Sequence, residues 1–182
     1  MNIYAKSICK ERVKMLKQCF DNVREKHPLV HNITNYVTVN DVANILLACG
    51  GSPIMADDSG EVEDITSICQ GLNINIGTLN KNTIPSMFLA GKKANVLGHV
   101  VLLDPVGAGA SGLRTKTANE LVRDIKFTVI RGNISEIRTL MEGTGNTKGV
   151  DADLADAVTE ENLDETIGKL KAFSEATGSV IA

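Results

Sequence analysis

The stretch that decides the fold class is Val100-Val101-Leu102-Leu103-Asp104-Pro105-Val106-Gly107-Ala108-Gly109. Its first four residues are continuously apolar, which is typical of a strand buried on both faces of a parallel sheet. Ligands bind beyond the carboxyl ends of such strands, where Asp104 is placed to hold a magnesium ion directly or through water. The glycines free the backbone to direct N–H groups at an anion. A plain strand-to-helix turn, with Asp104 only as a cap, is the alternative.

Short apolar strands alternate with helix-period segments on either side of this stretch. Strands are expected at residues 53–55, 72–76 and 127–130, and another begins at Ser179. Helices are expected at residues 7–26, 37–49, about 81–97, 134–142 and about 160–176, and through Val62, Ile65 and Cys69. Thr117 with Glu120 three residues later predicts a capping box that opens one more helix, and residues 143–158 predict a long connection. The strands recur roughly every 25 residues, which predicts a doubly wound, mostly parallel α/β sheet flanked by helices.

The composition favours a globular protein that acts on small molecules. The chain has 182 residues, of which 43% are hydrophobic and 3% aromatic, and a formal net charge of −3. Scarce aromatic side chains argue against base stacking, and the charge gives no reason to expect nucleic acid or an anionic membrane as a partner. No apolar run approaches the roughly 18 residues of a membrane span. The N-terminal segment carries Lys6, Lys10, Glu11 and Arg12 and has no long apolar run, which is unlike a signal peptide. A cytoplasmic protein is expected.

A second candidate segment is Arg131-Gly132-Asn133-Ile134-Ser135-Glu136, directly after the strand predicted at 127–130. Arg131 carries a planar fork of donors that suits a polyphosphate, and Glu136 would act through a metal-bound water. Asn133 with Glu136 three residues later is also the pattern of a helix-capping box. Both interpretations stay open, because the same residues can serve both purposes.

The third candidate segment is His31-Asn32-Ile33-Thr34-Asn35-Tyr36, a polar cluster followed by Asn40 and Asn44. Asparagine and threonine side chains bind an uncharged polar ligand through hydrogen bonds without adding charge. Buried asparagines that satisfy the backbone groups of a loop are the alternative. His31 is expected to be structural rather than catalytic.

Taken in order, these segments resemble those of hydroxyethylthiazole kinases. The resemblance covers essentially the whole chain and rests on residues 28–35 with Asn40 and Asn44, then 52–56, 75–79, 104–109, 131–136 and 148–151. A single motif of this kind would be weak, but the ordered set is highly specific.

The resemblance implies a single ribokinase-like domain over residues 1–182 and transfer of the γ-phosphoryl group of ATP, with Mg²⁺, to the hydroxyl of 4-methyl-5-(2-hydroxyethyl)thiazole in thiamine salvage. The residues it assigns to the thiazole alcohol are Met55, Asn35 and Asn40. Those it assigns to the nucleotide are Arg131, Asp104, Gly107 and Asn133, and those it assigns to magnesium are Glu136 and Asp104. It also implies a homotrimer whose thiazole site lies between subunits.

The chief departure from the family concerns what would follow Ala182. Family members continue with a threonine-glycine nucleotide contact and a glycine-rich loop that carries the catalytic cysteine. No catalytic residue is therefore assigned within the chain, which is expected to lack the C-terminal catalytic portion. In the family this glycine-rich loop forms an anion hole at a helix N-terminus. Loss of a single donor from an anion hole typically costs roughly 10²–10³ in rate, so a chain without the whole loop is expected to have little kinase activity.

Three other functions are weighed against the kinase. A non-catalytic fragment that binds ligand or only assembles into an oligomer is the first alternative. Dehydration of a damaged nicotinamide cofactor on the same fold is disfavoured, because a pocket for a dinucleotide should lack the compact set of Asn35, Asn40 and Met55. A Rossmann dehydrogenase is disfavoured because no G-x-G-x-x-G opens a helix after the first strand.

Overall fold

The computed structural model describes residues 3–143 and 158–182, with side chains from Arg12 onward. Its strands form one sheet in the order β2-β1-β3-β4-β5-β6, and every neighbouring pair is parallel. The strands are β1 (Leu29–Ile33), β2 (Ser52–Met55), β3 (Gly71–Asn75), β4 (Val100–Asp104), β5 (Val129–Ile130) and β6 (Val180–Ile181). The helices are α1 (Ile3–Lys26), α2 (Val39–Cys49), α3 (Val62–Ile68), α4 (Thr83–Leu97), α5 (Gly112–Asp124), α6 (Ile134–Glu142) and α7 (Leu163–Thr177).

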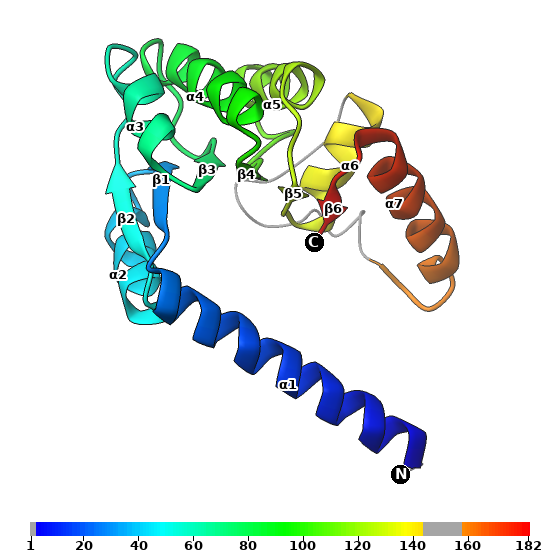
Figure 1. Cartoon of the computed structure of the whole chain (residues 1–182). Helices are drawn as coiled ribbons and strands as arrows, with labels where there is room; N and C mark the ends of the chain where they lie inside the picture. The colour runs from blue at the N-terminus through cyan, green and yellow to red at the C-terminus, as the bar shows by residue number, and fades with distance from the viewer. Residues whose placement is uncertain (1–2, 144–157) are drawn as a thin grey trace.

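The helices are distributed unevenly over the two faces of the sheet (Figure 1). Helices α3, α4 and α5 lie side by side along one face, while α2 packs near β2 on the other and α1 extends away from the body. Such crossovers are needed because parallel strands can be joined only by long connections, usually helical ones. The predicted parallel α/β architecture is thereby confirmed.

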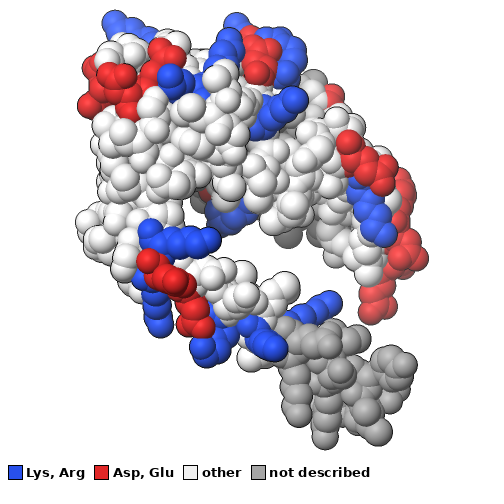
Figure 2. Space-filling model, viewed as in Figure 1, with Lys and Arg blue, Asp and Glu red and all other residues white. Residues whose placement is uncertain are grey.

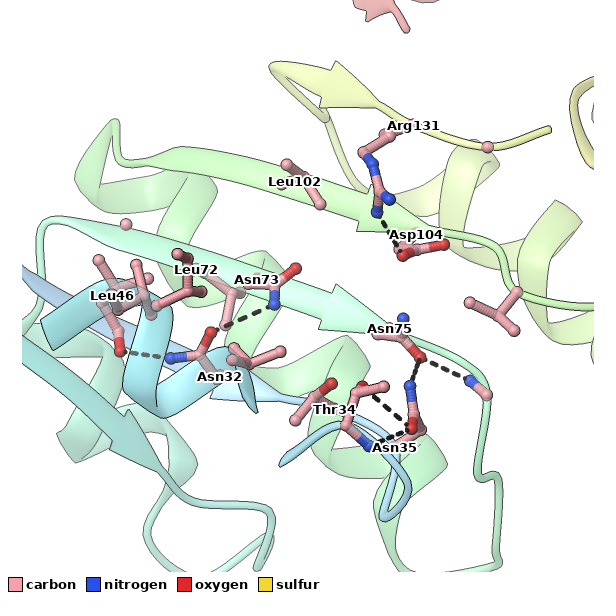
Figure 3. Close-up of a pocket in the computed structure, with 18 of the residues that line it drawn as sticks. Asn32, Thr34, Asn35, Leu46, Leu72, Asn73, Asn75, Leu102, Asp104 and Arg131 are labelled. Carbon is pink, nitrogen blue, oxygen red and sulfur yellow. Dashed lines mark hydrogen bonds and ion pairs between the residues drawn. The ribbon is translucent and has the colours of Figure 1, made fainter. Parts of the chain in front are cut away.

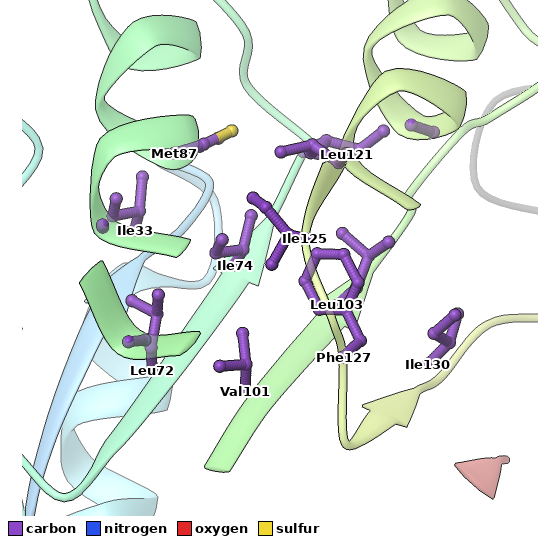
Figure 4. Close-up of a cluster of buried hydrophobic side chains, with 14 of the residues drawn as sticks. Ile33, Leu72, Ile74, Met87, Val101, Leu103, Leu121, Ile125, Phe127 and Ile130 are labelled. Carbon is purple, nitrogen blue, oxygen red and sulfur yellow. The ribbon is translucent and has the colours of Figure 1, made fainter. Parts of the chain in front are cut away.

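The hydrophobic core lies between the sheet and the row formed by α4 and α5 (Figure 4). Alternate residues of β3 and β4 point to this face, so that Leu72, Ile74, Val101 and Leu103 are fully buried. Met87 of α4 and Leu121 of α5 close over them; each large apolar side chain buried here contributes about 1.5–3 kcal/mol. This packing holds the central strands rigidly and fixes where their carboxyl ends lie.

The remaining residues of the same strands face the other way and are less covered. Asn73 and Leu102 are half-buried, and Val100 at the start of β4 is exposed. Among the described residues, only α2 and the end of α1 approach this face, near β1 and β2. The sheet therefore offers an open, partly polar surface opposite its core.

Three sequence predictions differ from the structure. Strand β1 was not expected, because His31 and Asn32 interrupt its apolar pattern; both side chains find hydrogen-bond partners inside the fold instead. The capping box at Thr117 was wrong, since Ser111 caps α5 by accepting a hydrogen bond from Arg114 N, and Thr117 is buried in the helix interior. The last helix begins at Leu163 rather than near residue 160, and most of the connection predicted at 143–158 lies outside the described residues.

Candidate functional site

An open cavity of about 1540 Å³ lies over the uncovered face of β1, β3 and β4 and extends past their carboxyl ends. Leu46 of α2 and Val23 of α1 line its near wall, while Arg131 and Glu136 line its far end. Charged side chains gather on the outer surfaces of the helices and along α1, whereas the side of the body that faces α1 is mostly uncharged (Figure 2). Ligand pockets typically measure roughly 300–1,000 Å³, so this open cavity is larger than most pockets that hold one small ligand.

The floor of the cavity is a row of neutral amides (Figure 3). Asn32 and Asn73 are paired in the β1–β3 register, and Asn73 Nδ2 donates to Asn32 Oδ1 at 3.2 Å. Asn32 Nδ2 donates in turn to the carbonyl oxygen of Val30 at 2.8 Å. These amides make the floor polar without adding charge, as the sequence pattern predicts for this segment.

Asn35 ties the loop after β1 to the end of β3. Its Nδ2 donates to Asn75 Oδ1 at 3.0 Å, and its Oδ1 accepts from both the backbone N and the hydroxyl of Thr38. Asn75 Oδ1 also accepts from Gly77 N at 2.9 Å, which closes the turn that leaves β3. Asn35 is buried at the wall of the cavity, so the structure brings this predicted residue to the site.

The other two residues expected near the thiazole lie elsewhere in the described structure. Asn40 is exposed on the first turn of α2, and Met55 is 37% exposed at the end of β2; neither lines the cavity. Ile45 and Leu47 of α2 are exposed as well. Their assignment to the substrate stays a prediction.

Asp104 and Arg131 form an ion pair at the carboxyl ends of β4 and β5. Arg131 Nη1 donates to Asp104 Oδ2 at 2.8 Å, and the Arg131 backbone N–H donates to the Leu103 carbonyl oxygen. Burial raises the pKa of Asp104 above its ordinary value, while the charge of Arg131 and hydrogen bonds from Asn75 and Arg131 oppose that rise. Asn75 lies in register with Asp104 on the neighbouring strand and so connects this pair to Asn35.

Glu136 is buried and holds the glycine turn after β4 against α6. Its Oε1 accepts from Gly107 N at 2.8 Å and its Oε2 from Asn133 N at 2.9 Å. Asn133 Oδ1 accepts from Glu136 N, so the predicted capping box is confirmed. Burial raises the pKa of Glu136, and the two backbone N–H donors oppose that rise. The Glu136 carboxylate therefore fixes Gly107 against the start of α6.

Arg114 is a site residue that the sequence reasoning missed. It lies in the first turn of α5 and lines the cavity, and its Nη2 donates to the carbonyl oxygen of Gly77 at 2.8 Å. Gly107 has a φ of +70°, and a Cβ added there would collide with Arg114 Nη1. The available signal was local, because a cation in the first turn of a helix opposes the helix dipole and needs another reason to be there.

The carboxylates suit Mg²⁺ only in combination with phosphate oxygens. Among the described residues, no three His, Cys, Asp or Glu side chains converge as a metal site. Mg²⁺ is usually bound by one or two carboxylates together with substrate phosphates and water, and Asp104 at its strand end fits that donor set. Both oxygens of Glu136 already accept backbone N–H groups, so Glu136 fits contact through a water better than direct ligation.

The fold and site define an α/β protein whose ligand cavity lies beyond the carboxyl ends of parallel strands. More particularly, the chain belongs to the hydroxyethylthiazole kinase family, whose model matches residues 20–181. Over the helical part of the described chain, no helix is both long and apolar enough to cross a bilayer.

Individual relatives agree with the family assignment. The chain is 68% identical over 168 residues to a hydroxyethylthiazole kinase of Clostridium acetobutylicum, covering 92% of this chain and 62% of that relative. It is 57% identical over 159 residues to one of Clostridium tetani, covering 87% and 57%. The solved structure of a hydroxyethylthiazole kinase protein from Pyrococcus horikoshii OT3 matches with a TM-score of 0.79 and 35% identity, over 93% of this chain and 60% of that one. The chain thus spans 57–62% of the length of these curated relatives.

Proposed function

We propose that this protein serves ATP-dependent phosphorylation of the hydroxyl of 4-methyl-5-(2-hydroxyethyl)thiazole, a step of thiamine salvage. The described residues would supply the part of the site that binds the alcohol and the phosphate chain of ATP. The observation that carries the proposal is the linkage of Asn35, Asn75 and Asp104 across the ends of β1, β3 and β4. This linkage sets a neutral amide wall directly beside an ion pair in one cavity.

The amide wall suits the acceptor. The thiazole alcohol is uncharged and has ring and hydroxyl atoms that hydrogen-bond to amides, while its methyl group needs apolar contact. Asn32, Asn35 and Asn73 offer amides, and Val42 and Leu46 of α2 offer apolar contact in the same cavity. The lining residues supplied by β1, the loop after it and α2 carry no charge, which suits an uncharged acceptor.

The far end of the cavity suits the phosphates of ATP. Arg131 is 65% exposed at its side chain, so its guanidinium fork is open to a polyphosphate even while it pairs with Asp104. The turn that contains Gly107 and Gly109, both with positive φ, follows Asp104 in the chain. Mg²⁺, held by Asp104 and reached by Glu136 through water, would neutralise phosphate charge there.

Phosphoryl transfer then depends mostly on position and on charge stabilisation. The acceptor oxygen forms a bond to the γ-phosphorus as the bond to the β,γ-bridging oxygen breaks, ADP takes the electron pair, and the hydroxyl proton passes to solvent. Asn35 would hold the alcohol and Arg131 the nucleotide, so that the two reacting atoms meet between them. The low turnover expected from the resemblance stays a prediction, which a coupled assay of ATP consumption checks.

A homotrimer in the cytoplasm is also part of the proposal. Several large apolar side chains of the loop after β1, of α2 and of β2 are exposed: Tyr36, Val37, Ile45, Leu47 and Met55. A neighbouring subunit packed there would cover them and would bring Met55 and Asn40 into a shared site. Light scattering should then give three times the chain mass of 19.4 kDa, and Val37→Glu should give the monomer mass. A monomer at all concentrations for the unmodified chain would contradict this part.

Titration calorimetry with two variants tests the proposed function. The chain should bind the thiazole alcohol and ATP with Mg²⁺, each saturably. Asn35→Ala should raise the dissociation constant for the alcohol about tenfold or more, because a buried amide with three hydrogen-bond partners is lost. The dissociation constant for ATP should change by no more than about threefold. Arg131→Gln should weaken the binding of ATP about tenfold or more and should leave the dissociation constant for the alcohol within about threefold. Failure of the chain to bind either ligand, or equal loss of both ligands in both variants, would refute the assignment.

A further inference from the structure

Arg114 is a half-buried cation in the cavity, and no described carboxylate pairs with it. Its one described side-chain hydrogen bond goes to a backbone carbonyl, that of Gly77. The two carboxylates nearby are otherwise engaged: Asp104 pairs with Arg131, and Glu136 accepts the N–H groups of Gly107 and Asn133. Within the described residues Arg114 therefore makes no ion pair, although it keeps further N–H donors.

The position of Arg114 is fixed from two sides. Its guanidinium contacts the turn after β3 through the Gly77 carbonyl oxygen, and it lies so close to Gly107, in the turn after β4, that a Cβ at position 107 would have to displace it. The φ of +70° at Gly107 also favours glycine. Thr115, the next residue of α5, accepts from Gly109 N at 2.9 Å and holds the far side of the same turn. Such a restrained guanidinium loses little freedom when it binds a ligand.

The order of groups along the carboxyl edge of the sheet places Arg114 between the two ligands. Asn35 lies at the β1 end, Gly77 with Arg114 follows at β3, Asp104 and Gly107 follow at β4, and Arg131 is last at β5. If the alcohol lies against Asn35 and the nucleotide phosphates reach Arg131, then the group between them is the terminal phosphoryl group. That group carries negative charge throughout its transfer.

We propose that Arg114 binds the transferred phosphoryl group, on the acceptor side of Asp104, while Arg131 binds the phosphates that remain with ADP. This rests on the proposed function for the identity of the two ligands. Arg114 then touches the γ-phosphate of ATP before transfer and the phosphate ester of the alcohol afterwards. The two arginines divide the anion between them, because Asp104 keeps Arg131 on the β5 side.

The experiment compares binding of ATP and ADP, both with Mg²⁺, to the unmodified chain and to three variants. Arg114→Gln should raise the dissociation constant for ATP by about tenfold to a hundredfold, as expected for loss of a charge-assisted contact. The dissociation constants for ADP and for the thiazole alcohol should stay within about threefold of those of the unmodified chain. Arg114→Lys keeps the charge but not the planar fork of donors, so its dissociation constant for ATP should lie between those of the unmodified chain and of Arg114→Gln. Arg123→Gln is the matched control, since Arg123 lies on the same helix and pairs with Asp124 at the exposed far end.

Each possible outcome decides the proposal. If Arg114→Gln weakens the binding of ATP, ADP and the alcohol equally, Arg114 only supports the turns. If Arg114→Gln does not weaken the binding of ATP, Arg114 does not contact ATP. Either result overturns the proposal. If Arg114→Lys binds ATP as tightly as the unmodified chain while Arg114→Gln is weakened, the contact with the phosphoryl group stands and depends on charge alone. Should the chain bind inorganic pyrophosphate through Arg114 but not ATP, the proposed function fails while an anion site remains. Should it bind none of these ligands, both fail.

Discussion

Gly107→Ala tests whether Arg114 really is locked against the glycine turn. The chain offers a matched control, because Gly98 at the end of α4 has the same φ of +70° and a Cβ added there meets nothing within 4 Å. At Gly107 the added Cβ would collide with Arg114 Nη1. The two alanine variants therefore share the backbone strain and differ in the displacement of one guanidinium.

The expected magnitudes follow from these two contributions. A left-handed conformation costs a residue other than glycine about 1–2 kcal/mol, which should be the whole cost of Gly98→Ala. Gly107→Ala should cost about 1 kcal/mol more, since Arg114 must leave the Gly77 carbonyl oxygen; a hydrogen bond to a charged group contributes about 1.5–3 kcal/mol, reduced here by partial exposure. The difference corresponds to about 2–4 °C in melting temperature for a chain of this size.

Chemical denaturation of both variants, alone and combined with Arg114→Gln, measures the coupling. In the Arg114→Gln background Gly107→Ala should cost no more than Gly98→Ala, which gives a coupling free energy of about 1 kcal/mol between positions 107 and 114. Gly98→Ala should be additive with Arg114→Gln. Equal costs for the two alanine variants in the unmodified chain, or additivity at positions 107 and 114, would refute the reasoning.

Three further perturbations follow from the site and its surroundings. Burial raises the pKa values of Asp104 and Glu136, so the folded chain holds their protons more tightly than the unfolded chain. Their contribution to stability therefore falls as pH rises above the ordinary values of 3.8 and 4.5. Mg²⁺ should raise the melting temperature more at pH 7 than at pH 5, and Asp104→Asn should abolish most of that gain. Burial lowers the pKa of His31, so the unfolded chain takes up this proton first and the free energy of unfolding should fall as pH drops below 6.5. His31→Gln should flatten this slope, as measured by denaturation at several pH values. Gly77→Ala puts a Cβ 2.9 Å from Asn35 Cβ and should raise the dissociation constant for the thiazole alcohol about tenfold, as measured by titration. Gly112→Ala is the control and should leave this dissociation constant unchanged, because a Cβ there meets no atom within 4 Å.

The general architecture was predictable because it follows from alternation and spacing. The apolar run at the start of β4 and the helix-period segments beside it depend on local physics, and they predicted a parallel sheet whose ligands lie at strand ends. The capping box at Asn133 and Glu136 is equally local, since its hydrogen bonds span three residues. Such features need no knowledge of distant partners.

Strand β1 and Arg114 were missed because distant residues determine them. His31 lies in a buried strand because Thr66 Oγ1 and the Ala56 carbonyl oxygen, from other elements, satisfy its ring nitrogens. Arg114 belongs to the site only because α5 returns it to the turns after β3 and β4. Thr117 matched a capping pattern, but the better cap at Ser111 begins the helix earlier.

The central claim is that an acceptor site and a phosphate site lie side by side in one cavity, and a ternary complex tests it most directly. The thiazole alcohol should be titrated calorimetrically into the chain saturated with Mg²⁺ and the β,γ-imido analogue of ATP, which cannot transfer its phosphoryl group. The alcohol should bind saturably to the nucleotide complex, with a dissociation constant equal to or lower than that for the chain alone. Mutual displacement of the two ligands, or absence of alcohol binding, would contradict the account.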